Sequence, residues 1–391
     1  MTDADLVPPP TQLDATALVV RARALVESGT TDLADHLLEV PLWYYRDADL
    51  FERERTEILA TTPLALVPTC RLAEPDDFLV REVLGTSVLV TRDGSGQAHA
   101  FLNYCRHRGA RPAEGCGSSR RFTCPYHAWT YDTEGQLVGL PGSEAFTDLD
   151  RSTHGLVELP SEERNGFIWV VLTADAEIDV AAHLGPLDAE LTQWHLDTSE
   201  FLVDRTFTSS VNWKSALEAF AENYHFAYVH GNSLIGQNTV GNTGAFDPFG
   251  LHHRLAFPSP WIVHAPEEVE SALDYVSLIY SVFPNLVLAV TVVGTEIIEI
   301  LPGDEPGTCT VLHGWMAMLP APDEATRAGY FELYEAVHAA LRNEDFAMLP
   351  SCGEAIRQAQ HDHMVIGRNE IGVQNVVRAF AATLDLDLTA Y

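Results

Sequence analysis

The pattern of hydrophobic and polar residues changes twice along the 391-residue chain. From Ala15 to Leu38, apolar residues recur at helical spacing, and Gly29 is expected to divide this run into two helices. A further helix is predicted from Asp47 to Leu59. Residues 1–12, which come before these segments, are polar and proline-rich, as is typical of a flexible arm.

Residues 61–175 consist of short apolar runs separated by turn residues, a pattern that predicts a small all-β domain. Asp93-Gly94 and Glu134-Gly135 are hairpin-type turn signals between such runs. The expected strands are Leu64–Val67, Phe78–Val83, Ser87–Thr91, Ala98–Asn103, Phe122–Cys124 and Phe167–Leu172.

Residues 176–391 mix strands with long helices, and helices over residues 13–60 precede both segments. Because the strands gather in the middle and the long helices follow, we expect an α+β domain with an antiparallel sheet. The expected strands are Phe201–Val211, Tyr275–Phe283, Leu286–Val293, Glu296–Leu301 and Cys309–Met318, and the expected helices are Ser215–Val229, Glu324–Asn343 and Asp345–Ile366.

Composition narrows the choice of partners. Hydrophobic residues make up 46% of the chain, which is sufficient for packed cores, and the formal net charge is −33. So acidic a chain is not expected to bind nucleic acid or an anionic membrane, whereas it would attract a basic surface on a redox partner. The sequence has neither an apolar run of about 20 residues nor a signal-peptide pattern at its start, so we expect a cytoplasmic protein.

Two of the six cysteines belong to a motif with metal-ligand spacing. Cys105-x-His107 is followed by sixteen residues and then by Cys124-x-x-His127. Two thiolates and two imidazoles are the ligand set of a Rieske [2Fe–2S] cluster, in which two cysteines hold one iron and two histidines hold the other. The alternative is a structural zinc site, although zinc fingers usually pair cysteine with cysteine and histidine with histidine.

The remaining cysteines are scattered, so they do not suggest a disulfide framework. Free thiols are expected at Cys70, Cys116, Cys309 and Cys352. Cys116 lies between two glycines in the segment that joins the two halves of the motif, and it is a candidate for a spare ligand.

A second candidate metal site lies in the segment that follows Asn212-Trp213-Lys214. His225 and His230 are five residues apart, so a helix must end or carry a π-type bulge between them if both are to bind one metal. This spacing excludes the HExxH arrangement of zinc proteases. Together with one distant carboxylate, the two histidines would form the facial triad of a non-haem Fe(II) oxygenase.

The segments CRHRG and CPYHAW, the latter followed closely by Tyr131, resemble the Rieske signature. The segment NWK, followed by a carboxylate three residues before the first histidine, resembles the catalytic segment of ring-hydroxylating Rieske oxygenase α subunits. This resemblance covers about residues 40–391 and implies a catalytic sheet flanked by helices in a helix-grip-like arrangement. The motif departs from the family only at Ala128, where glycine is usual. We expect the methyl group to be accommodated with a negative φ.

The resemblance also implies roles for individual residues. The third iron ligand would be Asp345, with Glu344 and Asp362 as alternatives, and Gln360 and the tail motif GRNEIGVQNVVRAF follow it. Glu222 would be the carboxylate that bridges a site histidine and a Rieske histidine of a neighbouring subunit. That bridge implies a head-to-tail ring of three chains, which would take electrons from a reductase or ferredoxin and would consume dioxygen.

These features predict a terminal oxygenase that hydroxylates an aromatic or alicyclic compound. The first alternative is an N- or O-demethylating monooxygenase, because a glutamate before Tyr-His resembles the branch that acts on quaternary ammonium compounds. The second is an electron carrier or a zinc-stabilised scaffold, which the long segment after the cluster motif disfavours. The sequence does not decide whether a separate β subunit accompanies the chain. The expected pocket residues are Phe220, Phe226, Phe283, Asn285 and Leu288.

Overall fold

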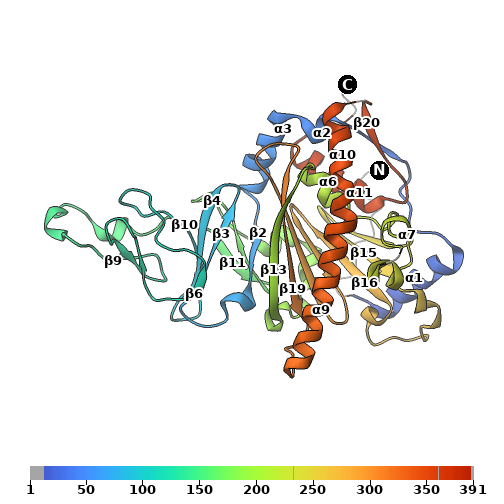
Figure 1. The fold of residues 1–391 in the computed structure, drawn as a ribbon, viewed down its shortest axis with the longest axis horizontal. Coiled ribbons are helices and arrows are strands. Elements are labelled where there is room, and N and C mark those ends of the chain that lie inside the picture. The colour runs from blue at the N-terminus through green and yellow to red at the C-terminus, as the bar shows by residue number, and fades with distance from the viewer. Residues whose placement is uncertain (1–12, 232, 360, 389–391) are drawn as a thin grey trace. The chain divides into compact units, whose positions relative to one another are not determined.

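The computed structural model describes residues 13–231, 233–359 and 361–388, and these form two compact units (Figure 1). One unit is Thr56–His183, and the other combines the described residues up to Arg55 with those from Leu184 onward. Boundaries at residues 61 and 175 remain sequence predictions. The expected flexible arm, residues 1–12, lies outside the described residues, and so does Gln360.

The unit Thr56–His183 is built from antiparallel strands, as expected of a small all-β domain. Its sheets have the strand orders β10-β5-β4-β3-β6, β11-β12-β2 and β7-β8-β9. All six expected strands are present, and the pattern missed five others that are only two to four residues long. The strands are β2 Leu64–Pro68, β3 Asp77–Val83, β4 Thr86–Arg92, β5 Ala98–Leu102, β6 Cys116–Ser118, β7 Phe122–Thr123, β8 Thr130–Tyr131, β9 Leu137–Gly139, β10 Glu158–Leu159, β11 Ser161–Arg164 and β12 Phe167–Val170.

The other unit contains one seven-stranded antiparallel sheet, in the order β13-β19-β18-β17-β16-β15-β14. All residues of β15 and β17 are buried, so both faces of this part of the sheet are covered, since alternate residues of a strand point to opposite faces. The pattern missed β14 and β15. The strands are β13 Glu200–Ser209, β14 Ala245–Phe249, β15 His252–Pro258, β16 Val276–Val282, β17 Leu286–Val290, β18 Gly294–Pro302 and β19 Cys309–Ala317.

One long helical run crosses this sheet in Figure 1. It consists of α9 (Glu324–Ala340), a π-helix η8 (Leu341–Asp345) and α10 (Phe346–Gln358). The tail motif forms most of α11 (Ile371–Thr383), which packs against β15. The α+β class with a helix-flanked antiparallel sheet is therefore confirmed.

The prediction of a helix continuing to Ile366 was wrong. Residues His363–Ile366 form β20, which pairs with β1 (Leu38–Pro41). Near the N-terminus, α1 (Ala15–Ser28) ends at Gly29, which has a left-handed φ of 64°. The second helix expected after Gly29 does not form, because backbone N–H groups there bond over long range: Asp32 to the carbonyl of Gly244 and Ala34 to that of Arg368.

A buried ion pair joins the N-terminal helices to the segment that leads into the second candidate site. After α2 (Trp43–Arg46) and α3 (Ala48–Arg53), the chain continues as a π-helix η1 (Glu54–Leu59), whose first residue points its carboxylate at Lys214 of α6 (Trp213–Glu218). The Lys214 side chain is fully buried and also donates to the carbonyl of Tyr44. The indole of Trp213 donates to the other oxygen of Glu54 at 2.8 Å.

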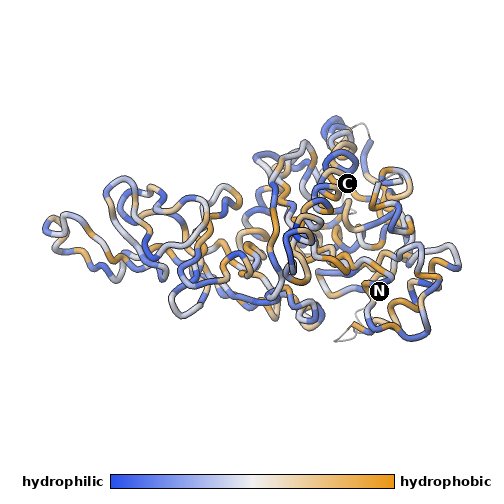
Figure 2. The backbone as a smooth tube through the Cα atoms, turned by 60° about the horizontal axis from the view of Figure 1, so that its bottom comes forward, coloured by the Kyte–Doolittle hydropathy of each residue, from blue (hydrophilic) through white to orange (hydrophobic). Residues whose placement is uncertain are grey.

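None of the described helices is both long and apolar enough to span a bilayer. Hydrophobic and hydrophilic positions alternate over short distances along the backbone (Figure 2).

We predict that Glu54→Gln lowers the free energy of unfolding by about 3 kcal/mol or more, because it leaves a buried ammonium group without its counter-charge. Urea titration followed by tryptophan fluorescence measures this loss. The matched control Glu52→Gln, at a side chain that is 68% exposed, should change stability by no more than about 0.5 kcal/mol. Equal effects of the two variants would contradict the role of the pair, whereas Glu54→Leu combined with Lys214→Met should recover much of the loss.

Candidate metal centres

The two halves of the Rieske-like motif lie on loops that fold in the same way. One loop follows β5, and the other joins β7 to β8. In each loop the cysteine N–H donates to the carbonyl five residues later, and the N–H four residues later donates to the cysteine carbonyl. The bonds are Cys105 to Ala110 (2.9 Å), Gly109 to Cys105 (2.8 Å), Cys124 to Trp129 (2.8 Å) and Ala128 to Cys124 (2.9 Å).

This equivalence explains the unusual residue in the second loop. Ala128 stands where Gly109 stands in the first loop, and both have a left-handed backbone, with φ of 59° and 79°. The expectation of a negative φ at Ala128 was therefore wrong, because its N–H must turn back to the carbonyl of Cys124. An alanine in this conformation costs roughly 1–2 kcal/mol that a glycine would not.

The donor atoms of the motif fit a two-iron cluster. The rings of His107 and His127 lie 4.5 Å apart between centroids, and their Nδ1 atoms are buried without a hydrogen-bond partner among the described residues. Buried polar atoms normally have partners, so these nitrogens are free to bind a metal. Cys105 and Cys124 are buried as well.

A tyrosine supports one of the two sulfurs. The hydroxyl of Tyr131 accepts the backbone N–H of Arg106 at 3.0 Å and lies within hydrogen-bond distance, 3.3 Å, of the sulfur of Cys105. Burial raises the pKa of the Cys105 thiol, which makes a bare thiolate unfavourable there. A metal cation would therefore be needed to hold the thiolate form. Cys116, the candidate spare ligand, instead lies exposed in the edge strand β6, opposite Leu79.

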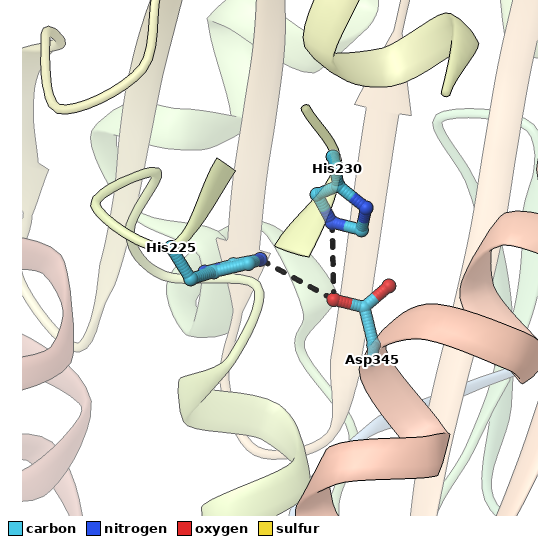
Figure 3. A group of neighbouring side chains, drawn as sticks. All are labelled: His225, His230 and Asp345. Atoms are coloured by element: carbon cyan, nitrogen blue, oxygen red, sulfur yellow. Dashed lines mark ion pairs between the residues drawn. The ribbon is translucent and has the colours of Figure 1, made fainter. Parts of the chain in front are cut away.

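The second candidate site brings three predicted residues together. The Nε2 atoms of His225 and His230 lie 3.3 Å and 3.1 Å from the same oxygen, Oδ1 of Asp345 (Figure 3). The three donor atoms lie within 4.8 Å of one another. Two imidazoles and one carboxylate form the donor set of a facial triad.

A further carboxylate holds the outer nitrogen of each ring. Nδ1 of His225 bonds to Glu222, and Nδ1 of His230 lies 2.6 Å from Glu344. Each Nδ1 therefore carries a proton that it donates to its glutamate, and each Nε2 is the nitrogen that faces Asp345. Burial lowers the pKa of His225, but hydrogen bonds to Asp345 and Glu222 outweigh this effect and raise the pKa to about 9. The site is thus strongly negative and suited to a cation.

Neither alternative for the third carboxylate lies at this centre. Glu344 contacts the outer nitrogen of His230, not the inner one. Asp362 is exposed, and its backbone carbonyl accepts the N–H of Leu42.

The histidines converge because the chain here is not a continuous helix. The predicted helix Ser215–Val229 was wrong: α6 ends at Glu218, and a four-residue helix α7 (Phe226–Val229) follows, with His225 and His230 at its two ends. The backbone carbonyl of Asn223 accepts the N–H of Asn242 at 2.8 Å, and its side chain donates to the carbonyls of Val240 and Thr243, so this residue bonds outside the helix. A π-helix does occur, but on the opposite side of the site, where η8 ends at Asp345.

The triad lies in the wall of a pocket of about 370 Å³. Most of its lining surface is apolar, and aromatic rings contribute from several elements: Phe220, Phe226, Phe257, Trp261, Tyr275 and Trp315. The described lining residues include no lysine or arginine. Among the acidic residues that line it is Glu296 of β18.

The sequence identified the pocket residues only in part. Phe220 and Phe226 line the pocket, as expected. Phe283, Asn285 and Leu288 do not; the lining residues of β17 are instead Val287 and Ala289, on the opposite face of the strand from Leu288. Because every position of β17 is buried, its sequence has no polar alternation that would identify the pocket face.

A second cavity, of about 250 Å³, lies on the other side of the site. Glu222, His225 and Asp345 line both cavities and so form a shared wall. The second cavity is also lined by Glu218 and Glu370, which makes it acidic. The site can therefore be approached from two directions by different groups.

Comparison with known proteins agrees with both centres. Residues 62–157 match the Rieske [2Fe–2S] domain, and residues 189–385, just over half of the chain, match the catalytic domain of the ring-hydroxylating α subunit. The chain belongs to the ring-hydroxylating α-subunit family of Rieske oxygenases. Its cofactors are a Rieske [2Fe–2S] cluster and a mononuclear non-haem iron.

Three relatives show the range of this family. The chain is 32% identical to the glycine betaine monooxygenase oxygenase subunit of Pseudomonas aeruginosa (strain UCBPP-PA14), over 49% of this chain and 44% of that protein. It is 28% identical to the carnitine monooxygenase oxygenase subunit of Escherichia coli (strain K12), over 49% and 52%. It is 33% identical to the anthranilate 1,2-dioxygenase large subunit of Acinetobacter baylyi, over 48% and 41%. The chain therefore spans about half the length of these relatives.

Solved structures show the same fold over almost the whole chain. The quaternary ammonium Rieske monooxygenase CntA with L-carnitine superposes with a TM-score of 0.76 at 19% identity, covering 94% of this chain and 98% of that one. Naphthalene 1,2-dioxygenase from Rhodococcus sp. gives a TM-score of 0.73 at 18% identity, again covering 94% and 98%.

The acidic cavity leads to a prediction about pH. Burial raises the pKa of Glu218 to about 8, although its hydrogen bond from Tyr45 and the nearby Lys214 lower it. A carboxyl group with a raised folded-state pKa stabilises the fold below its ordinary pKa, and this contribution is lost as the pH rises toward 8. Glu218→Gln should therefore weaken the fall in unfolding free energy between about pH 5 and pH 8. The exposed control Glu354→Gln should leave the slope unchanged, and an unchanged slope in both variants would contradict the prediction.

Proposed function

We propose that the chain is the terminal oxygenase component of a Rieske system, which uses dioxygen and electrons from a separate reductase or ferredoxin to hydroxylate a small organic molecule. One observation carries the proposal: His225, His230 and Asp345 converge in the wall of a mostly apolar pocket. An electron carrier or a zinc scaffold would need neither the pocket nor the triad.

In this proposal, Cys105, His107, Cys124 and His127 hold the cluster, and His225, His230 and Asp345 hold the iron. When bound, the cluster supplies single electrons and the iron activates dioxygen. Buried, unpartnered nitrogens in the first set and the convergent donor atoms of the second support the assignment.

The chain's own residues then position and shield the reaction. Glu222 and Glu344 keep each site histidine in the tautomer whose Nε2 faces inward. Phe226 packs against the rings of both site histidines and against Phe257, which covers this end of the pocket with apolar surface. Exclusion of water strengthens the interactions inside such a site.

The lining favours a neutral or cationic substrate. A buried carboxylate needs a partner, and no described lining residue is a lysine or arginine that would provide one. Aromatic rings and the carboxylate of Glu296 instead suit apolar groups or a cation. An aromatic or alicyclic compound without an acid group fits this description.

Oxidative demethylation of a quaternary ammonium compound is the second candidate. The aromatic lining favours it, because aromatic faces attract quaternary ammonium groups. The glycine betaine and carnitine monooxygenase relatives add support. In this reaction, hydroxylation of a methyl group releases formaldehyde.

We also propose a head-to-tail ring of three chains in the cytoplasm, with or without a β subunit. Glu222 faces the second cavity while it holds His225, so a cluster histidine from a neighbouring chain could reach it there. A report on a quaternary ammonium Rieske monooxygenase describes inter-subunit electron transfer in that protein. The exposed Cys116 and Cys352 are free thiols, which agrees with a reducing compartment.

Iron content tests the ligand assignment. Wild-type protein should hold three irons per chain. Asp345→Ala should hold two, keep the Rieske absorption and lose turnover, whereas His107→Ala should lose the cluster. The matched control Asp362→Ala should keep all three irons, and Glu344→Gln should bind the mononuclear iron about 10- to 100-fold more weakly without losing the site. Intact turnover in Asp345→Ala would remove that residue from the iron site.

Paired substrates test the pocket. Choline and glycine betaine share a trimethylammonium group and differ mainly in the carboxylate, and indane and benzoate form a neutral and an acidic aromatic pair. The experiment exposes chemically reduced enzyme to air for a single turnover. In each pair the enzyme should favour the member without a carboxylate at least tenfold, because an unpaired buried charge costs roughly several kcal/mol. Mass spectrometry and formaldehyde release identify the reaction. Preferential turnover of glycine betaine or benzoate would contradict the prediction.

A further inference from the structure

A line of three side chains leads away from the pocket on the side of β18 and β19. Glu296 lines the pocket, and its Oε2 lies 3.3 Å from Nε2 of His313. Nδ1 of His313 lies 2.9 Å from Nδ1 of His338, which belongs to α9. The pocket carboxylate is thus connected through two imidazoles to the outer helix.

The geometry suits a chain of hydrogen bonds. The two imidazole rings are parallel to within 6°, so their facing nitrogens lie in nearly one plane. His313 is fully buried, whereas His338 is partly exposed. The ring of Tyr334 lies beside both imidazoles, and its hydroxyl donates to the carbonyl of His313 at 3.0 Å.

The donor and acceptor roles of these groups determine the direction of their hydrogen bonds. The Glu296 carboxylate only accepts, so Nε2 of His313 carries a proton and its Nδ1 is left as an acceptor. Nδ1 of His338 must then be the donor to His313. The remaining nitrogen, Nε2 of His338, is free to take up a proton.

The surroundings keep His338 neutral at pH 7. Burial, His313 and Arg205 lower its pKa to about 4, and Arg342 acts in the same direction. Glu335 opposes them only weakly, and it is already paired with Arg205. A neutral imidazole can pass a proton from one nitrogen to the other.

We propose that His338, His313 and Glu296 form a proton relay from the protein surface to the substrate pocket. The inference rests on the proposed oxygenase function, since monooxygenation of RH consumes two protons: RH + O₂ + 2e⁻ + 2H⁺ gives ROH + H₂O. The relay serves the pocket as a source of protons and does not bind either cofactor.

One transfer moves a proton along three bonds. A proton from solvent binds Nε2 of His338, and the proton on Nδ1 of His338 moves to Nδ1 of His313. The proton on Nε2 of His313 then moves to Glu296, which becomes a carboxylic acid facing the pocket and releases its proton there. Because turning a ring does not move a proton between its nitrogens, the starting tautomers return by proton exchange with water during local opening of α9 between turnovers, so the relay delivers one of the two protons in each turnover.

Chemical rescue separates a relay from a packing role. With indane as the probe, the reduced holoenzyme of His338→Ala should form product about 10- to 100-fold more slowly than wild type, with unchanged iron content and cluster reduction. Added imidazole should restore the rate, and the solvent isotope effect in D₂O should change with it. Glu296→Gln should be equally slow but not rescued, and the exposed control His361→Ala should behave as wild type. A slow His338→Ala variant that imidazole does not restore would overturn the relay.

Neutron diffraction of holoenzyme crystals in D₂O tests the relay without turnover. Deuterium should lie on Nε2 of His313 and on Nδ1 of His338. Deuterium on Nδ1 of His313 instead would overturn the proposed direction. If wild-type enzyme formed no product from any probe, the oxygenase function and with it the purpose of the relay would fail, while the proton positions would still be measured.

Discussion

Hydrogen bonds to two glutamates decide which nitrogen of each site histidine faces the centre. Without Glu222 and Glu344, either ring could turn and present a protonated nitrogen to Asp345. The backbone on both sides of the site places these side chains. A four-residue helix separates the histidines, and a π-helix brings Glu344 and Asp345 to neighbouring positions that contact different atoms of His230. Adjacent carboxylates thus have distinct tasks, because successive side chains of a helix point in different directions.

The surrounding fold holds a concentration of negative charge next to apolar surface. Lys214 is fully buried and is paired with Glu54, so the triad depends on its own histidines and on a bound cation for balance. Glu222, His225 and Asp345 line both cavities, and four acidic residues line each of them. The two cavities therefore meet at a single layer of side chains.

Much of this organisation could be predicted from the sequence, because motifs and strand patterns are local. The apolar patterns of Ser87–Thr91 and Cys309–Met318 predicted strands that the structure contains. The spacing of the two histidines indicated a broken helix. Other features depend on distant partners. The segment after Gly29 forms hydrogen bonds to Gly244 and Arg368 instead of a helix, and these partners lie more than 200 residues away in sequence. No polar residue in β17 identifies the face that lines the pocket, because both faces of this strand are buried.

The two cysteine loops are each closed by their own backbone hydrogen bonds within six residues. Each loop presents one sulfur and one imidazole and needs no support from the spacing between the loops. The connecting segment, which includes the exposed strand β6, is therefore free to vary in length without changing either half. The constant elements of such a motif are the two short loops, and the distance between them in sequence is a poor guide when searching for the same centre in more distant chains.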